Sequence, residues 1–384
     1  NLSTILDLGY QPLANNFVKE PIVQNVYPLC LDRCIDCNHT QLNYTVRPEV
    51  LFRNYQYNSG TSATLRNYFK ELAHFCATDC GIKKGRVLEI ACNDGSQLNS
   101  YKALGLKTYG IDPATNLHAS SSAEHEVICD YFKQEHVAHY MNRVDIITAQ
   151  NVFAHNSYPL DFLKQCKEIM NDNTVLFIQT SQADMVKNNE FDTIYHEHLS
   201  FFNANSMNEL ARRAGLYLTG VNKTPIHGNS YVFVFRKQPH DGNLQAVLDQ
   251  EREQGLQDMN TYLAYADRCY EIVEDLNNVI EHYRDMQYVI VGYGAAAKGM
   301  TLLNFGKTTL DYIIDDNPLK QKLYTPGMNI PIVSIDLLEQ LKDKKIAFIP
   351  LAWNFFTEIR SKIKTKRDQE GDVFIRYFPT IKAE

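Results

Sequence analysis

The sequence predicts an α/β protein with two parallel, doubly wound sheets, a long helical segment between them and a small β-rich module in front. Two observations support this prediction. Strands of buried type alternate with helices in two separate stretches, and each stretch opens with a strand, a glycine-containing turn and a helix. The length of 384 residues agrees, because it exceeds that of an ordinary single domain.

The composition excludes several classes of protein. Apolar residues make up 44% and charged residues 22% of the chain, so extensive disorder is excluded. The formal net charge of −7 lacks the basic footprint of a nucleic-acid binder. No apolar run is long enough to cross a bilayer. The nine cysteines are odd in number and irregularly spaced, which predicts a reducing, cytoplasmic location.

The first 57 residues hold four prolines and a cysteine cluster but no long periodic run. This pattern predicts a small β-rich or metal-stapled module. Cys34 and Cys37 have the spacing of a zinc-binding pair. Either Cys30 or His39 could complete such a site, or a second pair could lie upstream of this sequence.

Helical periodicity over residues 62–80 precedes the first alternating stretch, and a late edge strand is expected over 230–237. Residues 244–286 read as a helical connector, after which a second alternation begins. The other predicted strands lie at 86–92, 108–113, 144–150, 174–180, 288–294, 310–316, 346–351 and 373–378. The predicted units are 1–60, 61–240, 241–286 and 287–384.

The first glycine turn, EIACNDG, is unsuited to a dinucleotide. Such a site needs several glycines against the pyrophosphate, whereas Gly95 stands alone here and Asp94 would repel phosphate. S-adenosylmethionine fits better, because carboxylates such as Glu89 can hold its positive groups. Asp112 ends the next strand, where a carboxylate meets ribose hydroxyls. The alternative is a structural turn with incidental acids.

The sequence YHEH (residues 195–198) is a second candidate site. If it lies on a strand, His196 and His198 share one face, as metal ligands do. Tyr195 and Glu197 also suit acid–base chemistry, while the alternative is a polar stretch before two core phenylalanines. His155 follows a predicted strand at the edge where doubly wound sheets bind ligands.

The second glycine turn, GYGAAAKG (residues 292–299), matches the dinucleotide pattern better. Lys298 next to a helix N-terminus would suit a phosphate or pyrophosphate. A tight packing turn between strand and helix is the alternative.

Several blocks together resemble a known family. LDLGYQPLANNF, YQYNSGTSATLRNYF, EIACNDGSQL, FDTIYHEHLSFF, GYGAAAKGMTLLNF and LAWNF are similar to blocks of the C-methyltransferases of nucleotide-linked keto-deoxysugars, of the tetronitrose C-3 type. The resemblance implies an N-terminal zinc module, a central class I methyltransferase domain with a Rossmann-like sheet, and a C-terminal Rossmann-like α/β domain contributing to nucleotide-sugar binding. It also implies a thymidine diphosphate (dTDP) sugar as substrate, with a monomer or weak homodimer as the assembly.

The resemblance assigns residues to three further roles. The zinc pair falls on Cys34 and Cys37, and the family's other pair would precede this sequence, which makes zinc occupancy in this chain doubtful. Substrate contacts are expected from Ser200, His227, Asn229 and Lys298, although the family's His-Gly-Gly-Ser reads His-Gly-Asn-Ser here. Cofactor contacts are expected from Glu89, Asn93, Asp94, Gly95, Asp112, Pro113, Asp130, Phe132 and Asn151.

The implied reaction is methyl transfer to C-3 through an enolate beside the C-4 ketone. His198 is expected as the general base, Tyr195 and Glu197 as its orienters, and Tyr57 (in a less favoured register, Tyr55) and His155 as donors near the ketone. Three alternatives remain: an NAD-dependent sugar oxidoreductase using the second glycine turn, a sugar O-methyltransferase, and a non-catalytic zinc scaffold.

Overall fold

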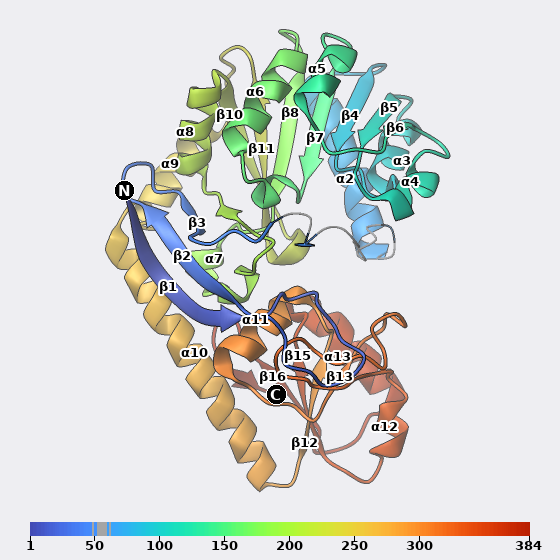
Figure 1. The fold of residues 1–384 in the computed structure, drawn as a ribbon, viewed down its shortest axis with the longest axis vertical. Coiled ribbons are helices and arrows are strands. Elements are labelled where there is room, and N and C mark those ends of the chain that lie inside the picture. Colours follow the sequence, from blue (N-terminus) through green and yellow to red (C-terminus); the bar gives the residue numbers. More distant parts are fainter. Residues whose placement is uncertain (48–49, 52–59, 61–62) are drawn as a thin grey trace.

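The computed structural model describes residues 1–47, 50–51, 60 and 63–384 (Figure 1). It has three sheets, of four, seven and six strands. The N-terminal sheet is antiparallel, with the order β1-β2-β3-β9, which confirms the β-rich module. Its fourth strand comes from the central part of the chain. The strands are β1 (Leu2–Gln11), β2 (Tyr27–Cys34), β3 (Thr40–Leu42) and β9 (Ser200–Phe201).

The central domain is a seven-stranded sheet of order β10-β11-β8-β7-β4-β5-β6. Strands β8, β7, β4, β5 and β6 are parallel, as the alternation of strands and helices predicts. The strands are β4 (Arg86–Ile90), β5 (Lys107–Ile111), β6 (Glu126–Ile128), β7 (Ile146–Gln150), β8 (Val175–Thr180), β10 (Tyr217–Thr224) and β11 (Ser230–Arg236).

Helices cover the two faces of the central sheet, and short helical turns follow several strand ends (Figure 1). The α-helices are α2 (Ala63–Cys80), α3 (Ser96–Ala103), α4 (Thr115–Ser121), α5 (Gln134–Tyr140), α6 (Pro159–Ile169), α7 (Met185–Asn188) and α8 (Ala204–Ala214). The short turns are η2 (Phe153–His155), η3 (Phe191–Thr193) and η4 (Ile226–Gly228).

The prediction of an edge strand over 230–237 is wrong, because β11 lies inside the sheet between β8 and β10. Strand β10 pairs with it antiparallel, from Tyr217 opposite Arg236 to Thr224 opposite Ser230, and becomes the edge. A glycine at 220 interrupts β10 at a register shift, and such a glycine weakens the strand signal in a sequence.

Two helices form the connector, α9 (Leu244–Glu253) and α10 (Met259–Asp285). The long helix α10 runs from the N-terminal sheet to the C-terminal domain (Figure 1). Its buried face, which includes Tyr265 and Leu276, belongs to one apolar core shared with β1, β2 and the C-terminal sheet. Burial of this shared core holds the N-terminal and C-terminal parts together.

The C-terminal domain has the strand order β14-β13-β12-β15-β16-β17 and is parallel except for β17. Among the described residues, no helix is both long and apolar enough to span a membrane. The elements are β12 (Val289–Tyr293), α11 (Ala297–Gly306), β13 (Tyr312–Ile314), β14 (Ile332–Val333), α12 (Leu337–Gln340), β15 (Ile346–Pro350), η5 (Trp353–Phe355), α13 (Phe356–Lys366), β16 (Val373–Arg376) and β17 (Lys382–Ala383).

Candidate active site

The turn between β4 and α3 forms a tight backbone cradle. Ala91, Asn93 and Gly95 have positive φ angles of 62°, 51° and 82°, a conformation that L-residues other than asparagine and aspartate rarely adopt. Asp94 fixes the start of α3, because its Oδ1 accepts the Ser96 amide at 3.0 Å. Three of the predicted cofactor residues, Asn93, Asp94 and Gly95, therefore stand on one strained turn at the carboxyl end of β4.

Carboxyl groups gather beside this turn. The amides of Asn93 and Ala114 donate to the two oxygens of Asp112 at 2.8 Å each. Glu89 is 4% exposed, and its Oε2 has no partner among the described residues. Burial, with the nearby charges of Asp112 and Asp94, raises the pKa of Glu89 well above its ordinary range. The site therefore favours a positively charged or hydrogen-bond-donating ligand.

These residues fit S-adenosylmethionine. The unpartnered oxygen of Glu89 can accept hydrogen bonds from an ammonium group, which lowers the cost of burying both groups. Each oxygen of Asp112 still has a free lone pair for a ribose hydroxyl, beside Pro113 at the end of β5.

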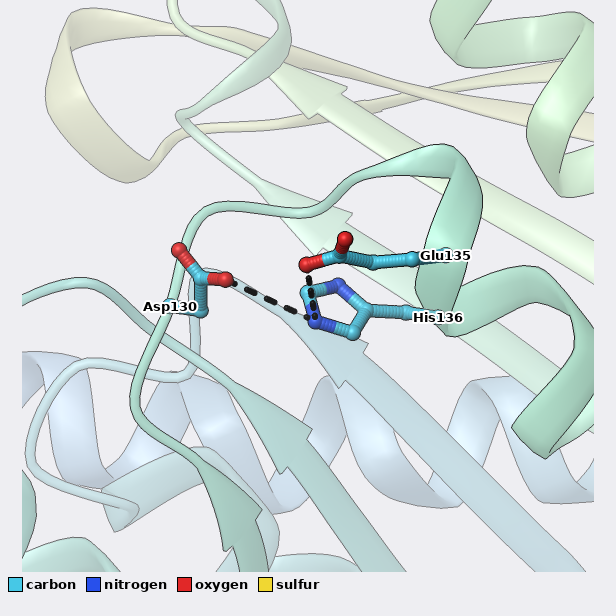
Figure 2. Close-up of side chains that lie close together, drawn as sticks. All are labelled: Asp130, Glu135 and His136. Carbon is cyan, nitrogen blue, oxygen red and sulfur yellow. Dashed lines mark ion pairs between the residues drawn. The ribbon is translucent and has the colours of Figure 1, made fainter.

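Two further residues expected to contact the cofactor, Asp130 and Phe132, follow the end of β6. Asp130 pairs with Lys133 at 2.7 Å and lies 3.7 Å from Nε2 of His136 (Figure 2). Phe132 is half-buried against the central core. Asp130, Glu135 and His136 are the one group of three potential metal ligands among the described residues. The Lys133 ammonium already supplies their positive charge, so the cluster does not favour a metal ion.

The YHEH segment is a turn that precedes β9, so the prediction of two histidines on one strand face is wrong. The side chains diverge instead. The His196 ring meets the edge of Tyr27 with 5.9 Å between ring centroids. Glu197 accepts a hydrogen bond from Nδ2 of Asn15 at 2.5 Å, and among the described residues it does not bond His198, which it was expected to orient.

His198 is held at both ring nitrogens. Nδ1 donates to the Thr193 carbonyl at 2.7 Å, so in the neutral ring Nε2 is an acceptor. The Tyr195 hydroxyl lies 2.9 Å from that nitrogen. The His155 ring lies beside it, with centroids 5.1 Å apart. Burial, then His155, and to a smaller extent Lys298, keep the pKa of His198 well below its ordinary value.

The remaining expected residues are spread more widely. Asn151 follows the end of β7 and has a positive φ of 53°. Its backbone N–H donates to the backbone carbonyl of Gln179, near the end of β8. Ser200 is 3.2 Å from Nε2 of His39, and both line a pocket of about 250 Å³ between the N-terminal sheet and α8. Leu199 and Asn156, which adjoin His198 and His155 in sequence, also line this pocket. Asn229 donates to Asp184 at 3.2 Å. The expected ketone donor at position 57 lies outside the described residues.

The C-terminal domain brings Lys298 to the His198 cluster. Its Nζ donates to the His227 carbonyl at 3.2 Å and lies 5.1 Å from the centre of the Trp353 ring. Nε1 of Trp353 donates to Oδ2 of Asp192 at 2.8 Å. The sequence analysis did not identify Trp353 and Asp192 as site residues, although Trp353 lies in LAWNF and Asp192 in FDTIYHEHLSFF, two segments that resemble the family. The available signals were the single tryptophan of the chain and an acid shortly before YHEH.

Two buried carboxyl groups lie near the Lys298 ammonium. Burial raises the pKa of Glu190 to about 7 and that of Asp192 to about 6, while Lys298 opposes both shifts. Asp192 is fully buried, and its Oδ1 has no partner among the described residues. This negative charge disfavours the predicted use of Lys298 as a diphosphate anchor.

The second glycine turn is built for packing. The Ala295 amide donates to the Asp315 carboxylate at 2.7 Å, so this amide of the turn is already bonded within the domain. A Cβ on Gly292 would come within 2.9 Å of Leu310, and one on Gly299 within 2.8 Å of Leu351. The geometry favours the structural alternative over an NAD site.

The described residues supply half of a tetrahedral zinc site, which needs four ligands. Cys34 and Cys37 flank the turn after β2. The two expected completing ligands have other partners, because Cys30 donates to Asp7 at 3.0 Å and His39 bonds Ser200.

Three family models match the chain in succession. They describe a zinc binding domain (residues 1–52), a methyltransferase domain (62–221) and a C-methyltransferase C-terminal domain (225–379). The chain is 26% identical over 371 residues to the C-methyltransferase NovU of Streptomyces niveus, covering 92% of this chain and 88% of that protein.

Other similarities are confined to part of the chain. The ubiquinone biosynthesis O-methyltransferase of Histophilus somni (strain 2336) is 27% identical over 113 residues, covering 26% of this chain and 46% of that protein. The PH0226 protein from Pyrococcus horikoshii OT3 covers 49% of this chain and 99% of its own, at 13% identity and a TM-score of 0.40. A likeness at that level carries no functional argument.

Proposed function

We propose that this chain is an S-adenosylmethionine-dependent C-methyltransferase that methylates C-3 of a 4-keto-deoxysugar carried on dTDP, in agreement with its similarity to the C-methyltransferase NovU and to the methyltransferase family models. The observation that carries the proposal is the pairing of the half-buried Tyr195 with the buried His198 in the central domain. The tautomer of His198 is fixed by the Thr193 carbonyl, and the ring faces histidines rather than carboxylates. A neutral imidazole in such a place can take a proton from carbon.

The reaction begins with loss of the proton on the carbon next to the ketone. The C–H electron pair becomes the carbon–carbon double bond, and the carbonyl π electrons move to oxygen. The proton ends on Nε2 of His198, where the Tyr195 hydroxyl lies, so that hydroxyl either relays the proton or is displaced by the substrate. The Thr193 carbonyl stabilises the imidazolium, because Nδ1 keeps its proton and its hydrogen bond.

The cofactor, when bound, supplies a methyl group made electrophilic by the sulfonium. The chain contributes alignment: we expect Glu89 and Asp112 to hold the cofactor at the carboxyl ends of β4 and β5. The segment carrying His198 meets the same edge after β7, where the Leu199 amide donates to the Ala154 carbonyl. Holding a nucleophilic carbon and a methyl group in line accounts for several kcal/mol of the barrier in such reactions, about 7–11 kcal/mol at most. The keto-sugar and dTDP assignments draw support from the similarity to NovU and from the sequence blocks.

His198→Ala tests the assignment of the base. We expect methyl transfer to a dTDP-4-keto-deoxysugar to fall at least about 100-fold, while the dissociation constant for S-adenosylhomocysteine changes less than about 2-fold. His240→Ala, at an exposed position, is the matched control. Near-normal turnover of His198→Ala would show that another group takes the proton.

A further inference from the structure

We propose that Lys298 stabilises the enolate oxygen formed during proton transfer and that Trp353 is the positioning residue that holds its ammonium group beside His198. This inference rests on the proposed function. It assigns to the C-terminal domain a part in the chemical step, in addition to any contact with the nucleotide.

The first support is the place of Lys298 on its helix. Lys298 lies in the first turn of α11, three residues before Thr301, so both side chains lie on the same side of the helix. Oγ1 of Thr301 is buried and donates to the Ile194 carbonyl at 3.1 Å. That residue follows Thr193, whose carbonyl fixes the His198 ring. Lys298 is thus directed to the segment that carries the base.

The second support is the spare hydrogen-bonding capacity of the ammonium. The Nζ group has three protons, and the one hydrogen bond recorded for it among the described residues is to the His227 carbonyl. A charged donor directed at an oxygen that becomes negative stabilises the transition state more than the neutral ketone. During the step Lys298 keeps its proton and donates a hydrogen bond, while His198 receives the substrate proton.

The third support is the charge balance. An uncompensated ammonium would be costly to bury, and Asp192 supplies the opposite charge one residue before Thr193. Because Glu190 and Asp192 have raised pKa values of about 7 and about 6, the group of one ammonium and two carboxyls has a net charge between zero and minus one near neutral pH. A ketone oxygen that gains one negative charge next to Lys298 therefore meets less repulsion than the two negative charges of a diphosphate.

Trp353 contacts each side of this arrangement. Its indole N–H donates to Asp192 at 2.8 Å, and its ring lies 5.1 Å from the Lys298 ammonium. The same ring packs against the backbone of Gly228, where a Cβ would come within 2.8 Å. Gly228 has a φ of +91° and follows His227, whose carbonyl binds Lys298. Trp353 therefore braces both the acceptor and the counter-ion of Lys298.

Solvent deuterium exchange at C-3 isolates the proposed step. The full chain is incubated in D₂O with a dTDP-4-keto-2,6-dideoxyhexose and S-adenosylhomocysteine, and loss of the C-3 proton signal is followed by NMR. We expect Lys298→Met to slow exchange by about 10²–10³-fold with KM changed less than about 3-fold. Lys298→Arg, which keeps the charge, should recover part of the rate, and exposed Lys364→Met is the matched control.

The positioning role needs a second variant. Trp353→Phe should slow exchange about 10-fold and add nothing in the Lys298→Met background, because residues that act as a unit are not additive. An unchanged exchange rate with a strongly raised KM in Lys298→Met would overturn the proposal in favour of a phosphate anchor. Additive losses would remove the positioning role from Trp353. If the wild-type chain itself exchanges no deuterium, the proposed function fails and this inference fails with it.

Discussion

The substitution Glu89→Gln should raise the stability of the ligand-free protein and weaken cofactor binding, two effects of opposite sign from one change. Glu89 is buried, one of its oxygens is unpartnered, and two carboxyl groups lie near it. A buried polar group without a partner costs about 1–3 kcal/mol. Glutamine keeps the size and removes the charge, so we expect the free energy of unfolding to rise by about 1 kcal/mol.

The pH dependence of this gain has a definite sign. Because the pKa of Glu89 is raised, the folded ligand-free protein binds a proton there more tightly than the unfolded chain does. The penalty from Glu89 therefore grows as pH rises above the ordinary glutamate value of 4.5 toward the raised pKa. The stability difference between Glu89→Gln and wild type should accordingly be larger at pH 8 than at pH 5.

Cofactor binding should respond in the other direction. A hydrogen bond to a charged group contributes about 1.5–3 kcal/mol, so its loss weakens S-adenosylhomocysteine binding by about 10- to 150-fold. Thermal unfolding with and without ligand measures both effects. Calorimetry in buffers of different ionisation enthalpy should detect the release of a proton when wild type binds the ligand, and no such release for Glu89→Gln. Exposed Glu71→Gln on α2 is the control. A Glu89→Gln protein with lower stability and unchanged affinity would refute the reasoning.

Three other predictions concern separate parts of the site. Tyr195→Phe removes the hydroxyl bonded to the His198 imidazole and, if His198 is the proposed base, should lower kcat for methyl transfer by about 10–100-fold; unchanged kcat would contradict its role. The half-buried His39 and His155 have pKa values lowered to about 4 by desolvation, so both are neutral near pH 7. Their stabilisation should be complete above pH 6.5 and fall by up to about 3 kcal/mol each toward pH 4, and a urea unfolding series that stays flat would be inconsistent with this. Gly228→Ala should cost about 1–3 kcal/mol and lower kcat, because its φ is +91° and a tryptophan ring fills the space beside it, whereas Gly9→Ala has a φ of +73° and open space. Equal thermal shifts and unchanged kcat in both variants would count against that packing.

Local spacing made part of the site predictable. Gly95 and Asp112 follow consecutive strands of a doubly wound sheet, so their meeting at one sheet edge follows from topology. Tyr195 and His198 are three residues apart, and their contact depends on one turn of chain. In both cases the spacing of the residues along the chain is enough to predict that their side chains lie close together.

Contacts between distant segments could not be predicted in this way. Trp353 and Asp192 are 161 residues apart in sequence, and they meet because α10 and the shared apolar core bring two α/β units together. The direction of His196 was missed for a different reason. On a strand, His196 and His198 would point to the same face, whereas in a turn their side chains can diverge. The local sequence is compatible with both, and the tertiary packing of the segment selects the turn.

Product structure tests the central claim most directly. The full chain is incubated with a dTDP-4-keto-2,6-dideoxyhexose and S-adenosylmethionine carrying a ¹³C methyl group, and the product is examined by carbon-detected NMR. Methyl transfer to C-3 predicts a labelled methyl carbon in the aliphatic range with a one-bond correlation to a quaternary ring carbon. A methoxy signal correlated through oxygen, or a labelled methyl group left wholly on the cofactor, would contradict the account.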